Sequence, residues 1–346
     1  MTENIQTTQD AVVEAQASSP FDAHTTLTVT TSPHIKSPTT SRSLMLDVVI
    51  ALLPATLWGI YVFGVRALIV TLISMISAIV FEGLYQWIMK KPITVLDFSA
   101  CLTGLLVGLN MPANVPFYVP VIGSFFAIVV VKQLFGGLGK NFMNPALTAR
   151  AFLMLAWPNA MTASPMPFDI DTVASATPMQ ILKTGALPEG GIYDLLLGIK
   201  SGCIGEISAL LLLAGGVYLI VRRVITWHIP VAYIGTVALL TFIFPQNIDV
   251  MSFMLSELFS GGLMLGAIFM ATDYVTSPIT AIGRLIYGVG CGLITVFIRY
   301  FGGYAEGVTF AILIMNTLVW YIDMLTKPRV FGTSRKAKKE TGVSAK

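Results

Sequence analysis

The sequence predicts an all-α polytopic membrane protein, with about ten transmembrane helices arranged as two inverted five-helix repeats. Composition is the first observation that predicts this class: of 346 residues, 55% are hydrophobic and 11% are charged. A soluble domain carries roughly 25% charged residues. The second observation is a succession of apolar segments, many near the length of about 20 residues that a bilayer core requires. A soluble doubly wound enzyme, a disordered protein and a coiled coil are excluded.

The two ends of the chain differ from its middle. Residues 1–43 are rich in Thr and Ser, lack the features of a signal peptide, and predict a disordered cytoplasmic tail. Residues 327–346 contain seven basic residues and one acid. Such a tail suits the anionic cytoplasmic face of a membrane better than a nucleic acid, so lipid is the expected partner and nucleic acid is not.

The middle of the chain, residues 44–326, is predicted to be the transmembrane domain. Ten apolar segments can be placed in it. They are 45–64, 66–89, 95–112, 116–135, 146–160, 205–223, 227–245, 255–273, 281–301 and 306–326.

Basic residues orient these segments. Six of them, and the basic tail, fall on one side of the predicted membrane: Lys90, Lys91, Lys140, Arg222, Arg223 and Arg284. Because cytoplasmic loops carry the excess of Lys and Arg, both termini are predicted to be cytoplasmic. The long connection 159–204 is then external, and the protein is expected to be multi-pass in the inner (cytoplasmic) cell membrane.

An internal repeat supports two inverted halves. The string from Gly104 to Gly108 matches Gly262 to Gly266, and Gln133-Leu-Phe-Gly-Gly matches Arg299-Tyr-Phe-Gly-Gly. Five segments separate each string from its match. Since five is odd, the two halves must face opposite ways, as in folds whose functional site lies near the membrane midplane. Chance recurrence of Gly and Leu strings is the alternative.

The external loop contains Asp171-Thr-Val-Ala-Ser-Ala-Thr177-Pro178. Proline biases the preceding Thr177 toward an extended backbone, which presents its hydroxyl. Alone, this string is a weak signal and is better explained as an ordinary polar loop. Elsewhere, Asn144-Pro145 is explained as a helix start. Three separated cysteines and the absence of hydrolase motifs give no catalytic or metal-binding residues.

Five ordered motifs together resemble one family. They are Ser32-Pro33-His34, Asn144-Pro-Ala-Leu147, Ser175-Ala-Thr177, Gly205-Glu-Ile-Ser208 and Thr272-Asp-Tyr-Val-Thr-Ser-Pro278. The sequence resembles the D subunit of Rnf electron-transport complexes, which is similar to the B subunit of sodium-translocating NADH:quinone oxidoreductase. The resemblance covers about residues 32–332.

The resemblance implies a flavin cofactor. Family members carry FMN joined through its phosphate to a threonine in an Asp-x-x-Ser/Thr-Gly-Ala-Thr loop, attached by a flavin transferase. Here the threonine is Thr177, with Asp171 and Ser175 in the attachment motif. The sequence departs from the pattern at Ala174 and at Ser175, both small changes. Relatives also hold a noncovalent riboflavin, whose site this sequence does not indicate.

The resemblance also implies a function. The chain is expected to be a flavoprotein subunit of a translocase that couples electron transfer between ferredoxin and NAD to Na⁺ or H⁺ movement. Its expected partners are the other subunits, including a second flavin-bearing subunit and iron–sulfur subunits. A secondary transporter or channel for a small polar solute is the alternative, and a purely structural membrane subunit is a third interpretation.

Charged residues within the segments receive two interpretations. Four acids near helix starts are assigned to the helix dipole alone: Asp47, Asp97, Glu206 and Glu306. Cations at helix ends are expected to extend to the interface: Lys90, Lys132, Arg222, Arg299 and Lys327. Glu82 fits neither rule and is predicted to line an ion path, with Asp273 as a second candidate. A carboxylate that pairs with a neighbouring subunit, or that lies near the lipid headgroups, is the alternative.

Overall fold

The computed structural model describes residues 40–168, 176–188, 191–247 and 249–328. Within these ranges the regular structure is helical, apart from isolated bridge residues at Ser164 and Met166. Each of the ten predicted apolar segments contains helix, so the all-α prediction is confirmed.

The first two predicted segments form one long element, α2 (Ser41–Ile88). Its backbone departs from helical geometry at Gly64, where φ is 70° and ψ is −162°. Glycine adopts positive φ without the steric penalty of a side chain. The element is therefore two helices joined at a kink, close to the predicted boundary.

The other helices of the first half are short. They are the 3₁₀ turn η1 (Val95–Asp97), α3 (Ser99–Leu109), α4 (Tyr118–Phe125), its π-helical continuation η2 (Phe126–Gln133), and α5 (Pro145–Ala156). The long connection contains α6 (Pro158–Thr162), α7 (Pro178–Lys183) and α8 (Gly191–Leu197).

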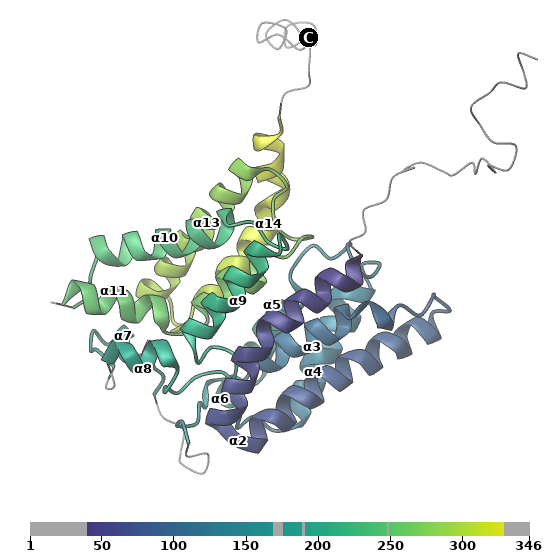
Figure 1. Ribbon diagram of the computed structural model, residues 1–346, viewed down its shortest axis with the longest axis horizontal. Helices are drawn as coiled ribbons and strands as arrows, with labels where there is room; N and C mark the ends of the chain where they lie inside the picture. The colour runs from purple at the N-terminus through teal and green to yellow at the C-terminus, as the bar shows by residue number, and fades with distance from the viewer. Residues whose placement is uncertain (1–39, 169–175, 189–190, 248, 329–346) are drawn as a thin grey trace, which may run out of the picture. The chain divides into compact units, whose positions relative to one another are not determined.

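The second half repeats the pattern of apolar helices. It comprises α9 (Ala209–Val221), α10 (His228–Ile243), α11 (Val250–Phe259), α12 (Leu263–Leu265), the π-helix η3 (Gly266–Met270), α13 (Ala281–Phe301) and α14 (Val308–Thr326). In Figure 1, α3 and α4 pack on α2, and α11 and α13 lie against α10.

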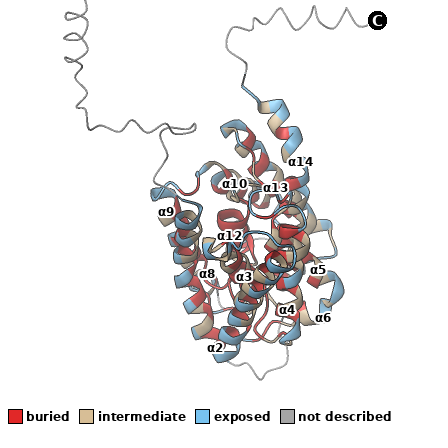
Figure 2. Ribbon diagram, turned by 90° about the vertical axis from the view of Figure 1, so that its right-hand side faces the viewer, coloured by how far each residue is buried: buried red, intermediate tan, exposed pale blue. Residues whose placement is uncertain are grey.

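Three helices in the described part of the chain are long and apolar enough to cross a membrane: α2, α13 and α14. A fourth candidate is α11 followed by α12 and η3, which bend by 59° at their break. The remaining apolar helices are shorter. Large apolar side chains such as Leu57, Val65 and Ile76 are exposed along α2. In Figure 2, exposed residues, in pale blue, recur along the outer helices of the molecule. A surface of this kind suits hydrocarbon better than water.

The eighth predicted segment differs from its prediction. A single helix was expected over 255–273, but the helix begins at Val250 and breaks between Phe259 and Leu263. Gly261 takes a φ of +64°, which favours glycine. A Cβ on Gly262 would lie 2.6 Å from Glu206 Oε1. The two glycines thus allow the chain to turn beside a buried carboxylate.

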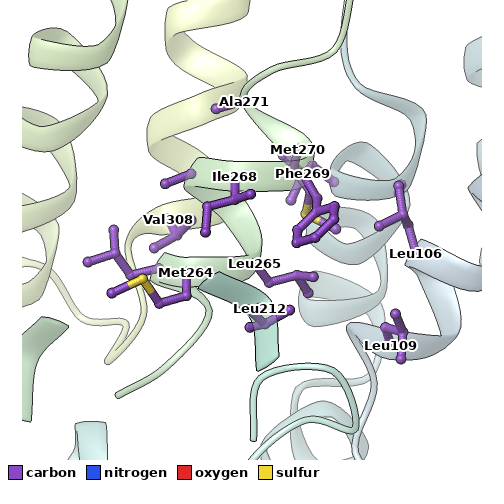
Figure 3. Close-up of a cluster of buried hydrophobic side chains, with 14 of the residues drawn as sticks. Leu106, Leu109, Leu212, Met264, Leu265, Ile268, Phe269, Met270, Ala271 and Val308 are labelled. Atoms are coloured by element: carbon purple, nitrogen blue, oxygen red, sulfur yellow. The ribbon is translucent and has the colours of Figure 1, made fainter. Parts of the chain in front are cut away.

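The C-terminal arm of this broken segment lies in the core. Figure 3 shows Leu265 and Phe269 among side chains from α3 and α9, including Leu106 and Leu212. Val308, at the start of α14, belongs to the same cluster. Because these helices come from both halves of the sequence, the broken segment joins the halves into one hydrophobic core.

Candidate functional site

Thr177 forms the N-cap of α7. Its backbone is extended, with φ −70° and ψ 153°, as Pro178 predicts. Thr177 Oγ1 accepts a hydrogen bond from the Gln180 amide at 3.3 Å, and Gln180 Oε1 accepts one from the Thr177 amide at 3.0 Å. This reciprocal capping box fixes the threonine at the start of the helix.

A cavity of about 280 Å³ lies beside Thr177. The connection 159–204 contributes Gln180, Lys183 and Cys203 to its wall, while Arg150 comes from α5. Gly303, Tyr304, Ala305 and Glu306 contribute from the loop between α13 and α14. Segments far apart in the sequence therefore converge on the threonine that was predicted to carry the flavin.

The other residues of the predicted attachment motif, Asp171 and Ser175, lie outside the described residues. The structure therefore places only Thr177 of the predicted cofactor-binding set.

Arg150 is the centre of a buried charged cluster at this cavity. Its Nη1 donates to Glu206 Oε1 at 2.5 Å and to Asn110 Oδ1 at 2.6 Å. Its Nη2 donates to Glu306 Oε2 at 2.5 Å. The Arg150 Nε is buried without a hydrogen-bond partner among the described residues. One guanidinium thus pairs with two carboxylates. Because Arg150 also lines the cavity, its Nε is a hydrogen-bond donor that a ligand there could use.

Lys200 adds a second cation near the same carboxylates. It lies in the long connection and donates a hydrogen bond to the carbonyl of Phe259, the last residue of α11. Burial lowers the pKa of Lys200 to about 8, against the opposing effects of Glu206 and Glu306. Lys200 therefore ties the long connection to the end of the first arm of the broken segment.

The interpretation of Glu206 and Glu306 as acids serving only the helix dipole was wrong. Both precede helices, but each pairs with Arg150 in the protein interior. Arg150 was not among the functional residues predicted from the sequence. A cation in the middle of the apolar segment 146–160 was the signal that could have identified it, since such charges require partners.

A second buried ion pair lies in the first half. Lys132 Nζ contacts the two Glu82 carboxylate oxygens at 2.8 and 3.0 Å, and donates to Ser99 Oγ at 2.6 Å. Gln133 Nε2 donates to Glu82 Oε1 at 2.7 Å. The expectation that Lys132 extends to the interface was wrong, because only 2% of this residue is exposed. Its partner, Glu82, holds it inside.

A third pair lies in the second half. Arg299 Nη1 donates to Glu257 Oε2 at 2.7 Å and to the Glu257 carbonyl at 2.8 Å. Arg299 was also expected to extend to the interface, and this too was wrong, since it is buried. By contrast, Arg222 pairs with Asp47 at 3.3 Å and its side chain is 55% exposed.

Asp273 lines a different cavity, also of about 280 Å³, together with Lys132, Asn141 and Asn144. Thr276 Oγ1 donates to Asp273 Oδ2 at 3.2 Å. Glu82 is not among the residues that line this cavity, but it pairs with Lys132, which is. Lys132, the partner of Glu82, thus lines the same cavity as Asp273.

Asn144 confirms the predicted helix start. Its Oδ1 accepts hydrogen bonds from the amides of Ala146 and Leu147 at 3.0 and 3.3 Å, and Pro145 opens α5. Asn144 Nδ2 donates to the Met270 carbonyl at the end of η3, at 3.1 Å. The cap therefore also joins α5 to the broken segment.

Comparison with known proteins gives a consistent assignment. The model of the NQR2, RnfD, RnfE family matches residues 28–332. The chain is 49% identical to the D subunit of the Na(+)-translocating ferredoxin:NAD(+) oxidoreductase complex of Acetobacterium woodii, over 91% of this chain and 98% of that protein. It is 42% identical to the D subunit of the proton-translocating ferredoxin:NAD(+) oxidoreductase complex of Clostridium ljungdahlii, over 89% and 97%. It is 39% identical to the D subunit of the ion-translocating oxidoreductase complex of Stutzerimonas stutzeri, over 85% and 93%.

Replacing Arg150 should strongly destabilise the protein. Arg150→Ala leaves Glu206 and Glu306 buried without their cation, and breaking a buried pair costs about 3–5 kcal/mol. Arg222→Ala is the matched control, because an exposed pair contributes about 0–1 kcal/mol. Thermal unfolding of the purified variants in detergent measures both. Equal unfolding midpoints for the two variants would contradict the structural role of Arg150.

Proposed function

The chain belongs to the NQR2, RnfD, RnfE family, and from this premise we propose that it is the D subunit of an ion-translocating ferredoxin:NAD⁺ oxidoreductase complex. The observation that carries this proposal is the agreement of the relatives, at 39–49% identity over most of both chains. The protein takes part in electron transfer and in the movement of Na⁺ or H⁺ across the membrane.

FMN is proposed to be joined through its phosphate to Thr177, which a flavin transferase would modify. The cavity supports this, because Thr177 lies in the wall of a hollow that also contains Arg150, Gln180 and Lys183. Two donors suit a ligand rich in acceptor oxygens and nitrogens: the Arg150 Nε, which has no partner within the described residues, and the side-chain NH₂ group of Gln180. These residues therefore fit the group.

Each residue has a distinct part in holding the flavin. Thr177 would anchor the phosphate, and the capping box with Gln180 orients the anchor. Lys183 is exposed at α7 and its Nζ is held by the Gly302 carbonyl at 2.5 Å, which places a positive charge beside the cavity. FMN, when bound, supplies the acceptance and release of electrons. Asp171 and Ser175 remain the predicted attachment motif.

The arrangement in the membrane is proposed to be ten helices in two inverted repeats, with both termini cytoplasmic and the connection 159–204 external. The repeat gains support from the buried charges. Gln133 and Arg299 occupy matching positions in the two strings, and each contacts a buried glutamate. In each half, the same position thus binds a carboxylate.

The ion path is proposed to include Asp273 and Glu82. Asp273 and Lys132 line the same cavity, and Lys132 pairs with the Glu82 carboxylate. An ion entering this cavity would compete with Lys132 for Glu82. A noncovalent riboflavin and contacts with a second flavin-bearing subunit and iron–sulfur subunits remain predictions from the family.

Thr177→Ala should abolish the covalent flavin while the chain still inserts into the membrane. The measurement is flavin fluorescence of the protein band under ultraviolet light after denaturing electrophoresis. Thr184→Ala is the matched control, because Thr184 lines the same cavity but lies at the C-terminal end of α7, not at its N-cap. An undiminished fluorescent band in Thr177→Ala would refute the assignment.

The proposed topology predicts opposite labelling of two introduced cysteines. Tyr193→Cys tests the external connection, where Tyr193 is 84% exposed, and Ser334→Cys tests the C-terminal tail. With the half-buried Cys101 replaced by serine, an impermeant maleimide should label Tyr193→Cys in intact cells and Ser334→Cys only after permeabilisation. Labelling of Ser334→Cys in intact cells would reverse the topology.

Glu82→Gln should reduce ion uptake per electron in the reconstituted complex, because it removes the carboxylate for which an ion would compete. Glu257→Gln is the matched control, since it alters the corresponding buried pair away from the Asp273 cavity. Electron transfer and ion uptake are measured together in proteoliposomes. A wild-type ratio of uptake to electrons in Glu82→Gln would leave this residue with a structural role only.

A further inference from the structure

Glu306 occupies a particular place in the charged cluster. It lies in the loop between α13 and α14, outside both helices, and lines the cavity that contains Thr177. Its side chain is 17% exposed, whereas that of Glu206 is 2% exposed and does not line the cavity. Of the two carboxylates that share Arg150, Glu306 is therefore the one that a proton can reach from the cavity.

The groups around Glu306 come from every neighbouring element. They are Arg150 from α5, Lys183 from α7, Lys200, Cys203 and Glu206 from the chain before α9, and Arg299 from α13. Arg150 is the cation in direct contact with Glu306. Because Glu206 competes for the same guanidinium, the negative charge of Glu306 is only partly compensated.

The titration of Glu306 agrees with this geometry. Burial, followed by the negative charge of Glu206, raises the pKa of Glu306 to about 7, against the opposing effect of Arg150. A further negative charge in the same cavity would raise the pKa again, because like charges disfavour the ionised carboxylate.

Resting on the proposed attachment of FMN to Thr177, we propose that Glu306 binds a proton when an electron reaches the flavin in this cavity. The electron comes from ferredoxin oxidation, the activity of the complex. The proton comes from water at the cavity and forms the O–H bond of the Glu306 carboxylic acid. Arg150 stays paired with Glu206, so the cluster gains one positive charge for the electron received. When the electron leaves, the proton is released.

The coupling between flavin reduction and protonation of Glu306 is measured as the pH dependence of the midpoint potential of this flavin. The potential is determined by spectroelectrochemistry of the purified complex between pH 5 and pH 9. The signal is the wild-type spectrum minus that of the Thr177→Ala complex. In the wild type the potential should be constant well below pH 7, where Glu306 is already protonated. Above that pH it should fall, approaching about 59 mV per tenfold change in proton concentration for one electron.

Three variants distinguish the effect of Glu306 on the pH dependence of the potential from the effects of its neighbours. Glu306→Gln should remove the pH dependence above pH 7, and Glu306→Asp should retain it. Glu206→Gln should retain the slope but start it at lower pH, because removing a negative neighbour lowers the pKa of Glu306. A slope in Glu306→Gln equal to that of the wild type would overturn the proposal.

If the Glu306→Gln variant fails to fold, a second measurement on the wild-type complex tests the proposal. Redox-difference infrared spectra of the wild-type complex should show a carboxylic-acid C=O band on reduction that is missing in Thr177→Ala. Absence of this band would overturn the proposal. Failure of the flavin attachment itself is distinguishable, because the wild-type protein would then lack the fluorescent band that Thr177→Ala should abolish.

Discussion

A charged side chain in the hydrocarbon core costs at least about 2.5 kcal/mol, so each one needs a partner or a polar cavity. In this chain the partners lie far apart in the sequence. Glu82 and Lys132 are 50 positions apart, Glu257 and Arg299 are 42 apart, and Arg150 reaches Glu306 across 156 positions. The ion pairs therefore determine which segments meet, while the apolar surface alone would accept many arrangements of the same helices.

The break in the eighth segment follows from the same constraint. Backbone that is not helical survives within a membrane protein only where it is buried in protein or lines a cavity. Here the Phe259 carbonyl receives the Lys200 ammonium, and the Gly262 backbone makes room for the Glu206 carboxylate. The charged cluster thus satisfies polar groups that the break exposes, and the break creates the space that the cluster fills.

The sequence was sufficient to predict the helices, because composition and segment length respond directly to the bilayer. It was also sufficient for the extended Thr177 and for the Asn144 cap, since proline acts on its immediate neighbours. The ion pairs could not be predicted in the same way. The position of Lys132 near a helix end fits an interfacial residue equally well, and only the approach of Glu82 from another segment decides that it stays inside. Local rules assigned Lys132 and Arg299 wrongly, because each is buried against a glutamate from a distant part of the chain.

In the proposed repeat, the two halves carry different side chains at equivalent positions. Adding the repeat offset of 158 to Ser99 gives Glu257, and adding 166 to Gln133 gives Arg299. Ser99 and Gln133 both contact the Glu82–Lys132 pair, whereas their counterparts form the second pair themselves. In the proposed inverted arrangement, these equivalent positions lie toward opposite membrane faces. One pair adjoins the cavity of Asp273, and the other acts on Glu306 beside Thr177. Each of the two cavities therefore has a buried ion pair next to it, and in the described part of the chain the cavity of Thr177 adds the acids Glu206 and Glu306 around Arg150, where the proposed coupling to electron transfer needs a titratable carboxylate.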